Sequence, residues 1–337
     1  MMNKLKFILV GCGMIGKRHA SLISQKNTLM AVCDILPERA REFAAKFSCR
    51  SYTEISEMIA EENADVLVVC TPNGLHAQHS ILALQHGINV LCEKPMAIQL
   101  ADCLKMISAA DAVKKHLLVV KQNRYNPPVS AIKQIFDKGA LGKVSSFQLN
   151  CFWHRPANYY LDSWHGSKEL DGGTLFTQFS HFIDLLYWFL GDVEFVHAIG
   201  GNYLHEGTID FEDAGAVLIK MKNGVIGTMN YNVNTVKRNM EGSFTLFGNK
   251  GTVKIGGEYL NRLEYFEVDG MEMPELKSGN PANNYGSHSG SMNNHSEVYD
   301  HLEKVLNGEQ APQPDAREAM KTVEIISQIY KKLQLTQ

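Results

Sequence analysis

The sequence predicts an α/β protein in which an N-terminal Rossmann domain, a doubly wound parallel sheet, is followed by an αβ domain with a large, mostly antiparallel open sheet. Three observations lead to this prediction. Strand-length apolar runs alternate with helical segments up to about residue 121. Beyond residue 190, strand-like runs succeed one another through links that contain glycine or asparagine. A glycine-rich turn at 11–16 separates the first apolar run from the first helical segment.

The first part of the chain supplies the parallel sheet. Its strands are expected at 6–10, 29–34, 64–71, 88–93 and 117–121. The helices between them are expected at 14–25, 37–47, 75–86 and 99–115. Pro37 in a first turn and Gly87 after a last turn are typical of helix boundaries. Strands and helices of these lengths connect by right-handed crossovers, which makes neighbouring strands parallel.

The rhythm of the chain changes after residue 123. Helices are expected at 129–138, 176–190, 291–306 and 316–333, and loops at 154–165 and 276–294. Strands are expected at 144–153, 193–203, 214–222, 225–234, 242–248, 251–256 and 262–268. The links 222–224 and 248–251 contain asparagine and glycine, which favour antiparallel hairpins.

Length and charge limit the number of domains and the classes of partner. At about 150 residues per domain, a chain of 337 residues predicts two domains, 1–122 and 123–337, with the C-terminal helix a candidate for packing back on the first. The net charge of −3 argues against nucleic acid or an anionic membrane as the main partner, because both require a basic surplus. No apolar run approaches the roughly 20 residues that span a bilayer.

The N-terminal segment and the cysteines predict a cytoplasmic protein without a metal. The apolar run 7–10 is too short for the core of a signal peptide. The seven cysteines form no CxxC pair, so neither a disulfide framework nor a structural zinc site is expected. The group His154, Asp162, His165 and His181 matches no common ligand spacing.

The glycine-rich turn has the context of a dinucleotide site. Gly11, Gly13 and Gly16 form a GxGxxG between a strand and a helix, and Asp34 ends the next strand. Glycines let the backbone approach a pyrophosphate, and an acid at that position accepts hydrogen bonds from ribose hydroxyls. Asp34 would repel a 2′-phosphate, which favours NAD over NADP. A turn without a ligand is the alternative.

Two later strand ends complete the expected cofactor site. In a doubly wound sheet, ligands bind at the carboxyl ends of the strands. The segments 71–73 and 93–95 follow two strands, so Lys94 is expected to point into the cofactor crevice, although a surface lysine in a turn is more common. The residues expected to contact NAD are Gly11, Gly13, Met14, Ile15, Gly16, Asp34, Thr71, Pro72, Asn73, His76, Glu93, Lys94 and Gln122.

Four motifs occur together in this chain. They are Gly11–Gly16, Thr71-Pro72-Asn73, Glu93-Lys94-Pro95, and Gly172-Gly173 followed by His181-x-x-Asp184. Their combination resembles the glucose–fructose oxidoreductase/inositol dehydrogenase (Gfo/Idh/MocA) family over essentially the whole chain, and Glu-Lys-Pro is the most specific part. The resemblance implies NAD-dependent hydride transfer at one carbinol carbon of a sugar, sugar nucleotide or polyol. It also implies that Lys94 and His181 are the catalytic pair.

The chemistry of hydride removal agrees with these two side chains. A secondary alcohol needs a base for its hydroxyl proton and a cation for the developing alkoxide. We assign the first role to His181 and the second to Lys94. Asp184 lies three residues after His181, so both share a helix face and the carboxylate could orient the ring. A core histidine bonded to a backbone carbonyl is the alternative for His181.

One departure from the family narrows the expected substrate. Many members place an Asp four residues before this histidine, where this chain has Thr177. Further segments, at 121–127, 155–166, 170–173, 241–253 and 284–288, resemble the UDP-N-acetyl-2-amino-2-deoxyglucuronate 3-dehydrogenases of bacterial O-antigen (lipopolysaccharide) synthesis. This branch implies oxidation of C3 of a UDP-N-acetylhexosaminuronate to a 3-keto sugar nucleotide.

The expected substrate site combines cations, hydroxyls and amides. An arginine can pair with an oxyanion in a forked geometry, and tyrosines offer hydroxyls and stacking faces. The residues expected to bind the substrate are Asn123, Arg124, Arg155, Tyr159, Tyr160, Gln178, Asp184, Tyr285 and His288. As alternatives, Arg124 could pair with a neighbouring acid, and the tyrosines could pack at a subunit interface.

Other functions remain open on the residues alone. Another sugar or polyol dehydrogenase, an NAD-dependent glycosidase of the same fold, and a non-catalytic NAD-binding regulator are the alternatives. We also expect a homodimer or homotetramer formed through the sheet of the second domain. A sheet face of this domain has alternating apolar positions, as in the runs 217–219 and 225–227, and the domain has too few helices to cover both faces.

Overall fold

The computed structural model describes residues 4–161, 163–284 and 289–335, and its contacts divide the chain into two compact units. The first unit extends to Val120 and also contains His295–Val323. The second contains Lys121–Asn294 and the chain from Glu324 onward. The division we expected keeps 123–337 in one piece, whereas the structure groups His295–Val323 with the first unit. The physical reason is the apolar face of helix α9 (His295–Leu306), which packs against α1 (Met14–Lys26).

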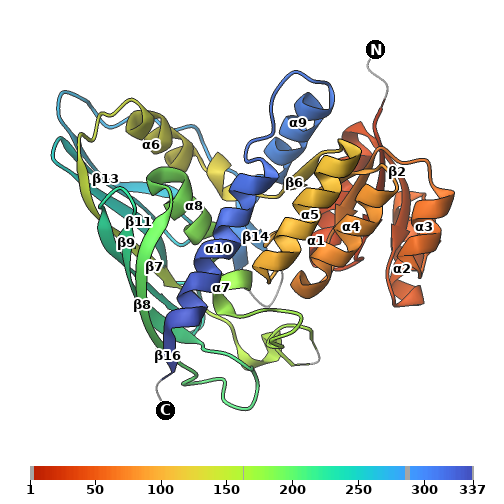
Figure 1. Ribbon diagram of the computed structural model, residues 1–337, viewed down its shortest axis with the longest axis horizontal. Helices are drawn as coiled ribbons and strands as arrows, with labels where there is room; N and C mark the ends of the chain where they lie inside the picture. The colour runs from red at the N-terminus through yellow and green to blue at the C-terminus, as the bar shows by residue number, and fades with distance from the viewer. Residues whose placement is uncertain (1–3, 162, 285–288, 336–337) are drawn as a thin grey trace. The chain divides into compact units, whose positions relative to one another are not determined.

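The first unit is built on a parallel sheet of six strands in the order β3-β2-β1-β4-β5-β6 (Figure 1). The strands are β1 Lys6–Val10, β2 Thr28–Cys33, β3 Arg50–Tyr52, β4 Val66–Val69, β5 Asn89–Cys92 and β6 Leu117–Val119. The remaining helical segments are α2 Pro37–Phe47, α3 Ile55–Glu61, η1 Asn73–Leu75, α4 His76–Gln85 and α5 Leu100–Val113. Helix α10 (Ala316–Lys332) begins in this unit and ends in the second.

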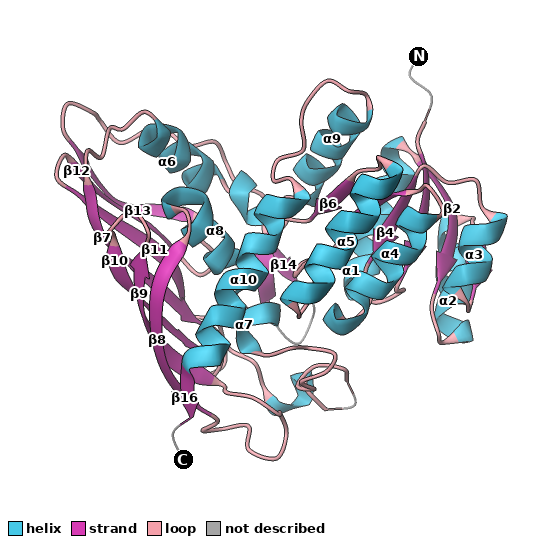
Figure 2. Cartoon of the chain, in the orientation of Figure 1, coloured by secondary structure: helices cyan, strands magenta, loops and turns pink. Residues whose placement is uncertain are grey.

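Helices cover both faces of this sheet, as the buried strands require (Figure 2). Phe7, Ile8 and Leu9 on β1 are fully buried, so neighbouring side chains that point to opposite faces are both covered. Helix α1 contacts α2 and α9, and helix α4 contacts α3 and α5. The order of the strands reverses between β1 and β4, which is where doubly wound sheets bind ligands.

The second unit is built on an eight-stranded sheet in the order β13-β12-β11-β7-β10-β9-β8-β16. Its strands are β7 Val144–Phe152, β8 Val193–Gly201, β9 Ala214–Met221, β10 Ile226–Asn232, β11 Glu241–Gly248, β12 Gly251–Gly256, β13 Arg262–Val268 and β16 Leu333–Leu335. The β7–β10 and β8–β16 pairs are parallel and the other pairs are antiparallel. The predicted fold class is therefore confirmed.

Helices α6 (Pro127–Asp137) and α8 (Ser180–Leu190) lie against one face of the eight-stranded sheet (Figure 1). Phe189 of α8 packs edge-on against Phe244 of β11, and Phe244 packs in turn against Phe147 of β7. On the opposite face, Leu218 and Ile226 are 51% and 53% exposed. The sheet thus has one buried and one exposed side, which produces the apolar–polar alternation of its strands.

Several elements differ from the expectation in extent or existence. The helix expected at 176–190 is two helices, α7 (Thr174–Thr177) and α8, with Gln178 and Phe179 between them. The expected loop 276–294 contains a short antiparallel pair, β14 (Ala282–Asn284) and β15 (Ser289–Met292). The three-residue strands β3 and β16 and the short helix α3 were not expected, because elements so short show no clear periodicity.

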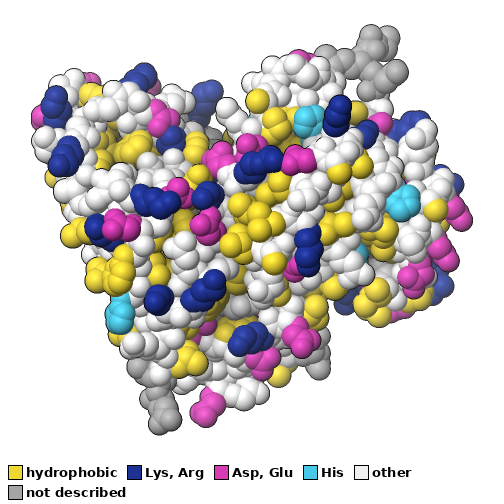
Figure 3. Space-filling view, in the orientation of Figure 1, with side chains coloured by type: hydrophobic (Ala, Val, Ile, Leu, Met, Phe, Trp, Pro, Cys, Tyr) yellow, Lys and Arg dark blue, Asp and Glu magenta, His cyan; other side chains and the backbone are white. Residues whose placement is uncertain are grey.

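The remaining short segments of the second unit are η2 Gln122–Tyr125 and η3 Ala157–Tyr159. Among the helices that the structure describes, none is long and apolar enough to cross a bilayer. Lys and Arg side chains are interspersed with Asp and Glu on the face shown in Figure 3, in agreement with the small net charge.

Candidate active site

The glycine-rich turn sterically excludes a side chain at two of its three glycines. Gly11 has φ +97°, and a Cβ there would lie 2.5 Å from a carbonyl oxygen at the end of β4. A Cβ on Gly16 would overlap the carbonyl oxygen of Gly11, whereas a Cβ on Gly13 would meet nothing. Met14 and Ile15 form the first turn of α1 directly after Gly13. The backbone and the helix N-terminus are therefore accessible to an anion such as a pyrophosphate.

Asp34 is fixed beside this turn by the backbone. It follows β2, and its Oδ2 accepts the backbone N–H of Cys12 at 2.8 Å. Its Oδ1 accepts the backbone N–H of Leu36 at 3.0 Å. Each carboxylate oxygen can accept a second hydrogen bond, so Asp34 retains capacity for ribose hydroxyls. The next side chain, Ile35, is 86% exposed and offers nothing to a 2′-phosphate.

The segments after β4 and β5 are tied together by a buried histidine. His76, on α4, has its Nδ1 2.7 Å from the Pro95 carbonyl oxygen and its Nε2 2.9 Å from the Thr71 carbonyl oxygen. Burial lowers the pKa of His76, although these carbonyls partly oppose the shift. Pro72 and Asn73 belong to the segment after β4, and Glu93–Pro95 form the turn after β5. The structure thus joins four of the expected cofactor residues to the turn that carries Lys94.

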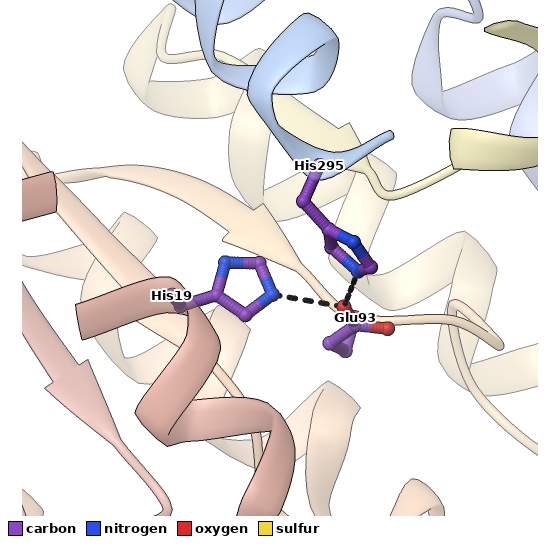
Figure 4. A group of neighbouring side chains, drawn as sticks. All are labelled: His19, Glu93 and His295. Carbon is purple, nitrogen blue, oxygen red and sulfur yellow. Dashed lines mark hydrogen bonds and ion pairs between the residues drawn. The ribbon is translucent and has the colours of Figure 1, made fainter. Parts of the chain in front are cut away.

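Glu93 is the centre of a buried cluster that the sequence pattern does not reveal (Figure 4). Its Oε1 lies 2.9 Å from Nε2 of His19 on α1 and 3.3 Å from Nε2 of His295 at the start of α9. The Tyr299 hydroxyl lies 2.8 Å from Nδ1 of His19. Among the described residues, this is the group of His, Cys, Asp and Glu side chains whose ligand atoms come close enough to suggest a metal. A buried polar residue on the packed face of α1 was the available sequence signal for His19.

Asp184 is neutralised by two cations from the start of the second unit. Arg124 donates to its Oδ2 through Nε at 2.8 Å and to its Oδ1 through Nη2 at 2.9 Å. Nζ of Lys121, a residue that we did not expect here, lies 3.0 Å from Oδ1. Burial alone would raise the pKa of Asp184, but Arg124 and Lys121 hold it well below its usual value. The alternative considered for Arg124, pairing with a neighbouring acid, is what the structure contains, whereas we expected Arg124 to bind substrate.

His181 and Asn123 are buried polar groups of the same unit. Nε2 of Gln122 lies 3.1 Å from Nε2 of His181, so the amide can donate to the ring. Gln122, which we expected at the cofactor, thus contacts the expected catalytic base. Both side-chain polar atoms of Asn123 are buried and have no hydrogen-bond partner among the described residues. Buried amides are normally paired, so an unpaired one marks a place for a ligand or water.

Arg155 is a buried cation surrounded by neutral groups. Its Nε donates to Oε1 of Gln178 at 2.7 Å, and its Nη1 donates to the His154 carbonyl at 2.7 Å. The guanidinium carbon lies 5.1 Å from the ring centroid of Trp153 and 5.4 Å from that of Tyr159. Among the described residues, the hydrogen-bond partners and rings around Arg155 include no carboxylate.

The two expected tyrosines play different parts. Tyr159 accepts a hydrogen bond from Nε2 of Gln178 at 3.0 Å and stacks on His165 with ring centroids 4.3 Å apart. Tyr160 is buried and packs edge-on against Tyr159 and His205. Burial raises the pKa of Tyr160. Tyr159 therefore belongs to the group around Arg155, and the buried Tyr160 packs against the ring of Tyr159.

The structure gathers the expected residues into two sets, one in each unit. Tyr285 and His288, expected to bind substrate, and Asp162 lie outside the described residues. The first unit holds Gly11, Gly13, Met14, Ile15, Gly16, Asp34, Thr71, Pro72, Asn73, His76, Glu93 and Lys94. The second holds Gln122, Asn123, Arg124, Arg155, Tyr159, Tyr160, Gln178, His181 and Asp184.

Family profiles match both units. Residues 5–121 match the oxidoreductase family with an NAD-binding Rossmann fold, and residues 129–254 match the GFO/IDH/MocA C-terminal domain. The predicted NAD-binding fold is confirmed by the first match.

Two solved structures are similar over nearly the whole chain. The WlbA dehydrogenase from Bordetella pertussis, in complex with NADH and UDP-GlcNAcA, is 34% identical with a TM-score of 0.88, covering 98% of this chain and 96% of that one. The WlbA dehydrogenase from Chromobacterium violaceum, in the same kind of complex, is 33% identical with a TM-score of 0.89, covering 98% and 94%.

Curated relatives match over a shorter span. A 1-carboxy-3-chloro-3,4-dihydroxycyclohexa-1,5-diene dehydrogenase from Comamonas testosteroni is 31% identical over 215 residues, which are 62% of this chain and 53% of the relative. Two further relatives are each matched over 59% of their length. The chain therefore spans between half and three-fifths of these curated relatives.

Proposed function

Because the chain belongs to the Gfo/Idh/MocA oxidoreductase family, we propose that it is an NAD-dependent dehydrogenase of a sugar carbinol, and that the carbinol is C3 of a UDP-N-acetylhexosaminuronate. The product is then a 3-keto sugar nucleotide. The whole-chain likeness to two dehydrogenases in complex with UDP-GlcNAcA supports the substrate class. The departure at Thr177 supports a site different from that of the inositol dehydrogenases.

The residues divide the work as follows. Bound NAD supplies the hydride acceptor, and the glycine turn and Asp34 hold it through its pyrophosphate and ribose groups. His181 is assigned to accept the hydroxyl proton, and the Gln122 amide lies 3.1 Å from Nε2 of its ring. Lys94 stabilises the negative charge that develops on the carbinol oxygen. Asn123 pairs its two free polar atoms with sugar hydroxyls.

The observation that favours an anionic substrate is Arg155. A buried guanidinium is costly unless an anion compensates it, and the neutral groups around Arg155 provide none. Arg124 differs, because it already has an ion-pair partner in Asp184. We assign the substrate's carboxylate to Arg155, with Gln178 and Tyr159 holding the guanidinium in place.

The proposed location and the proposed assembly rest on separate observations. All the cysteines are free thiols, in agreement with a reducing compartment, and we place the enzyme in the cytoplasm. We further propose a homodimer or homotetramer in which the exposed faces of two eight-stranded sheets pack together.

The test is a substrate panel assayed with NAD. UDP-GlcNAcA, UDP-GlcNAc, free GlcNAcA, myo-inositol and levoglucosan are compared by NADH absorbance and product mass. We expect a 3-keto product from UDP-GlcNAcA, and kcat/KM for UDP-GlcNAc lower by about 100-fold or more because the carboxylate is missing. No turnover of any uronate nucleotide would refute the substrate. Release of the nucleotide or aglycone without net NADH would indicate the glycosidase instead.

Variants separate chemistry from binding in the same assay. Lys94→Ala and His181→Ala should abolish turnover and leave NAD binding nearly unchanged, as followed by quenching of NADH fluorescence. Arg155→Gln should raise KM for UDP-GlcNAcA and leave the weak turnover of UDP-GlcNAc unchanged. Substantial activity in either alanine variant would contradict the assigned roles.

A further inference from the structure

We propose that His19 and His295 are positioning residues for Lys94, and that they act through the carboxylate of Glu93. This inference rests on the proposed role of Lys94. All three side chains belong to the first unit, and none is more than 5% exposed. They come from α1, from the end of β5 and from the first residue of α9, so the cluster joins three distant parts of the sequence.

The two oxygens of Glu93 have separate partners. Oε1 takes the two imidazoles, at 2.9 Å and 3.3 Å (Figure 4). Oε2 accepts the backbone N–H of Lys94 at 3.0 Å. The carboxylate is planar and rigid, so a rotation that releases the histidines also moves Oε2 away from that N–H. The orientation of the Lys94 backbone is thereby coupled to the two imidazoles.

The buried charge of Glu93 strengthens the coupling between the two imidazoles and the Lys94 backbone. Burial by itself would raise the pKa of Glu93, but its hydrogen bond with His19 and its contact with His295 hold it well below its usual range. Burial lowers the pKa of His295, opposed by Glu93 and assisted by His19 and Arg18. Glu93 is consequently a buried carboxylate whose compensation comes mainly from the two rings. Removing either ring leaves that charge undercompensated, which costs more than the loss of an ordinary hydrogen bond.

A hydroxyl fixes the more central ring. With the proton of His19 on Nε2 directed at Glu93, its Nδ1 can accept from the Tyr299 hydroxyl at 2.8 Å. Tyr299 is itself buried and packs against the rings of His19 and Phe7. The cluster therefore has a defined orientation from α9 through α1 to the Lys94 turn.

The composition of the cluster also suits a metal, and the geometry favours the ion pair. Two histidines and one carboxylate supply three ligand atoms within 4.8 Å of one another. A structural zinc site uses four protein ligands, and a catalytic one keeps an open position for water or substrate. Here all three residues are buried, and the cation Arg18 is near enough to lower the pKa of His295. A divalent ion would meet that positive charge without a fourth ligand from this group.

The test compares substitutions that remove or retain the donors. In His295→Leu and His19→Leu we expect kcat to fall about tenfold to a hundredfold, with KM for NAD changing less than about threefold. His19→Gln and His295→Gln retain a donor and should recover part of kcat. The matched control is Leu302→Ala, a fully buried change on the same helix, α9, seven residues after His295. It should lower the melting temperature and leave kcat close to wild type.

A second readout does not depend on the substrate. The rate at which acetic anhydride labels Lys94, followed by peptide mass spectrometry, should change in the two leucine variants and stay as in wild type in Leu302→Ala. If the wild type oxidises no sugar, the proposed function fails while the labelling still tests the cluster. Unchanged kcat and labelling in folded leucine variants would overturn the inference. So would one equivalent of tightly bound metal in the wild type that is lost in His295→Leu.

Discussion

Individual residues show how differently this chain treats its buried carboxylates. Asp184 meets two cations, which lower its pKa. Glu212 is equally buried, yet its Oε1 accepts hydrogen bonds from the hydroxyls of Tyr231 at 3.1 Å and Tyr330 at 2.9 Å. Burial, only partly offset by these hydroxyls, raises the pKa of Glu212 from 4.5 to about 7. The partner therefore decides which protonation state is native.

Glu212→Gln should change how stability depends on pH. In the wild type, the native state holds a proton on Glu212 between pH 4.5 and about 7 that the unfolded state releases, so stability falls as pH rises through this range. The glutamine mimics the protonated form and cannot ionise. From about pH 5 to about pH 8, the variant should gain about 3 kcal/mol relative to wild type, measured by urea unfolding. Glu206→Gln, at an exposed site, is the control; a pH-independent difference for Glu212→Gln would contradict the assignment.

At the scale of elements, the glycine turn separates folding from binding. Gly16 is required because α1 crosses the carbonyl of Gly11 at contact distance. Gly13 has open space at the same turn, so packing does not require its lack of a side chain, and we propose that this position serves the ligand. The same sequence pattern thus contains two glycines that packing requires, Gly11 and Gly16, and one that it does not, Gly13.

Alanine at Gly16 should lower stability, whereas alanine at Gly13 should lower the affinity for NAD. Gly16→Ala should lose about 1–3 kcal/mol of stability through overpacking. Gly13→Ala should stay within about 0.5 kcal/mol of wild type and lose about tenfold or more in NAD affinity. Thermal unfolding and NADH fluorescence titration measure the two effects. Equal loss of stability in both variants would contradict the different roles assigned to Gly16 and Gly13.

At the scale of the molecule, the exposed face of the eight-stranded sheet leaves apolar side chains in contact with water. Phe195 on β8 and Ile226 on β10 flank Lys220 on β9 in register, and Leu218 lies two residues before Lys220 on β9. The three apolar side chains are each about half exposed. A second copy of the same face would remove this apolar surface from water.

Leu218→Lys should therefore weaken self-association. Each copy would place a new positive charge beside Lys220 in the interface, and like charges repel when buried together. We expect multi-angle light scattering to give the mass of a smaller species than for wild type. Val236→Lys adds the same charge at an exposed position outside the strands and should not change the mass. A wild type that is already a monomer would refute the proposed assembly.

The predictable part of this protein is the part with local causes. The strand–glycine turn–helix at 6–26, the hairpins at 222–224 and 248–251, and the position of Asp34 follow from periodicity and turn chemistry over short stretches. The helix at 176–190 was predicted as one piece, because its break at Phe179 leaves the apolar pattern intact. The glycine-rich turn was predictable because its residues are neighbours in sequence.

By itself, the sequence determined the fold class, the NAD-binding turn and the residue types available for catalysis, since each rests on contacts within one strand–turn–helix or hairpin. Only the tertiary structure decided which charges are compensated. In the folded chain, Asp184 pairs with Arg124 and Lys121, and Arg155 lies among neutral groups. His295 contacts Glu93, although some 200 residues separate them in the sequence. Ion pairing depends on a few ångströms between distant segments, and no periodicity in the sequence encodes that distance.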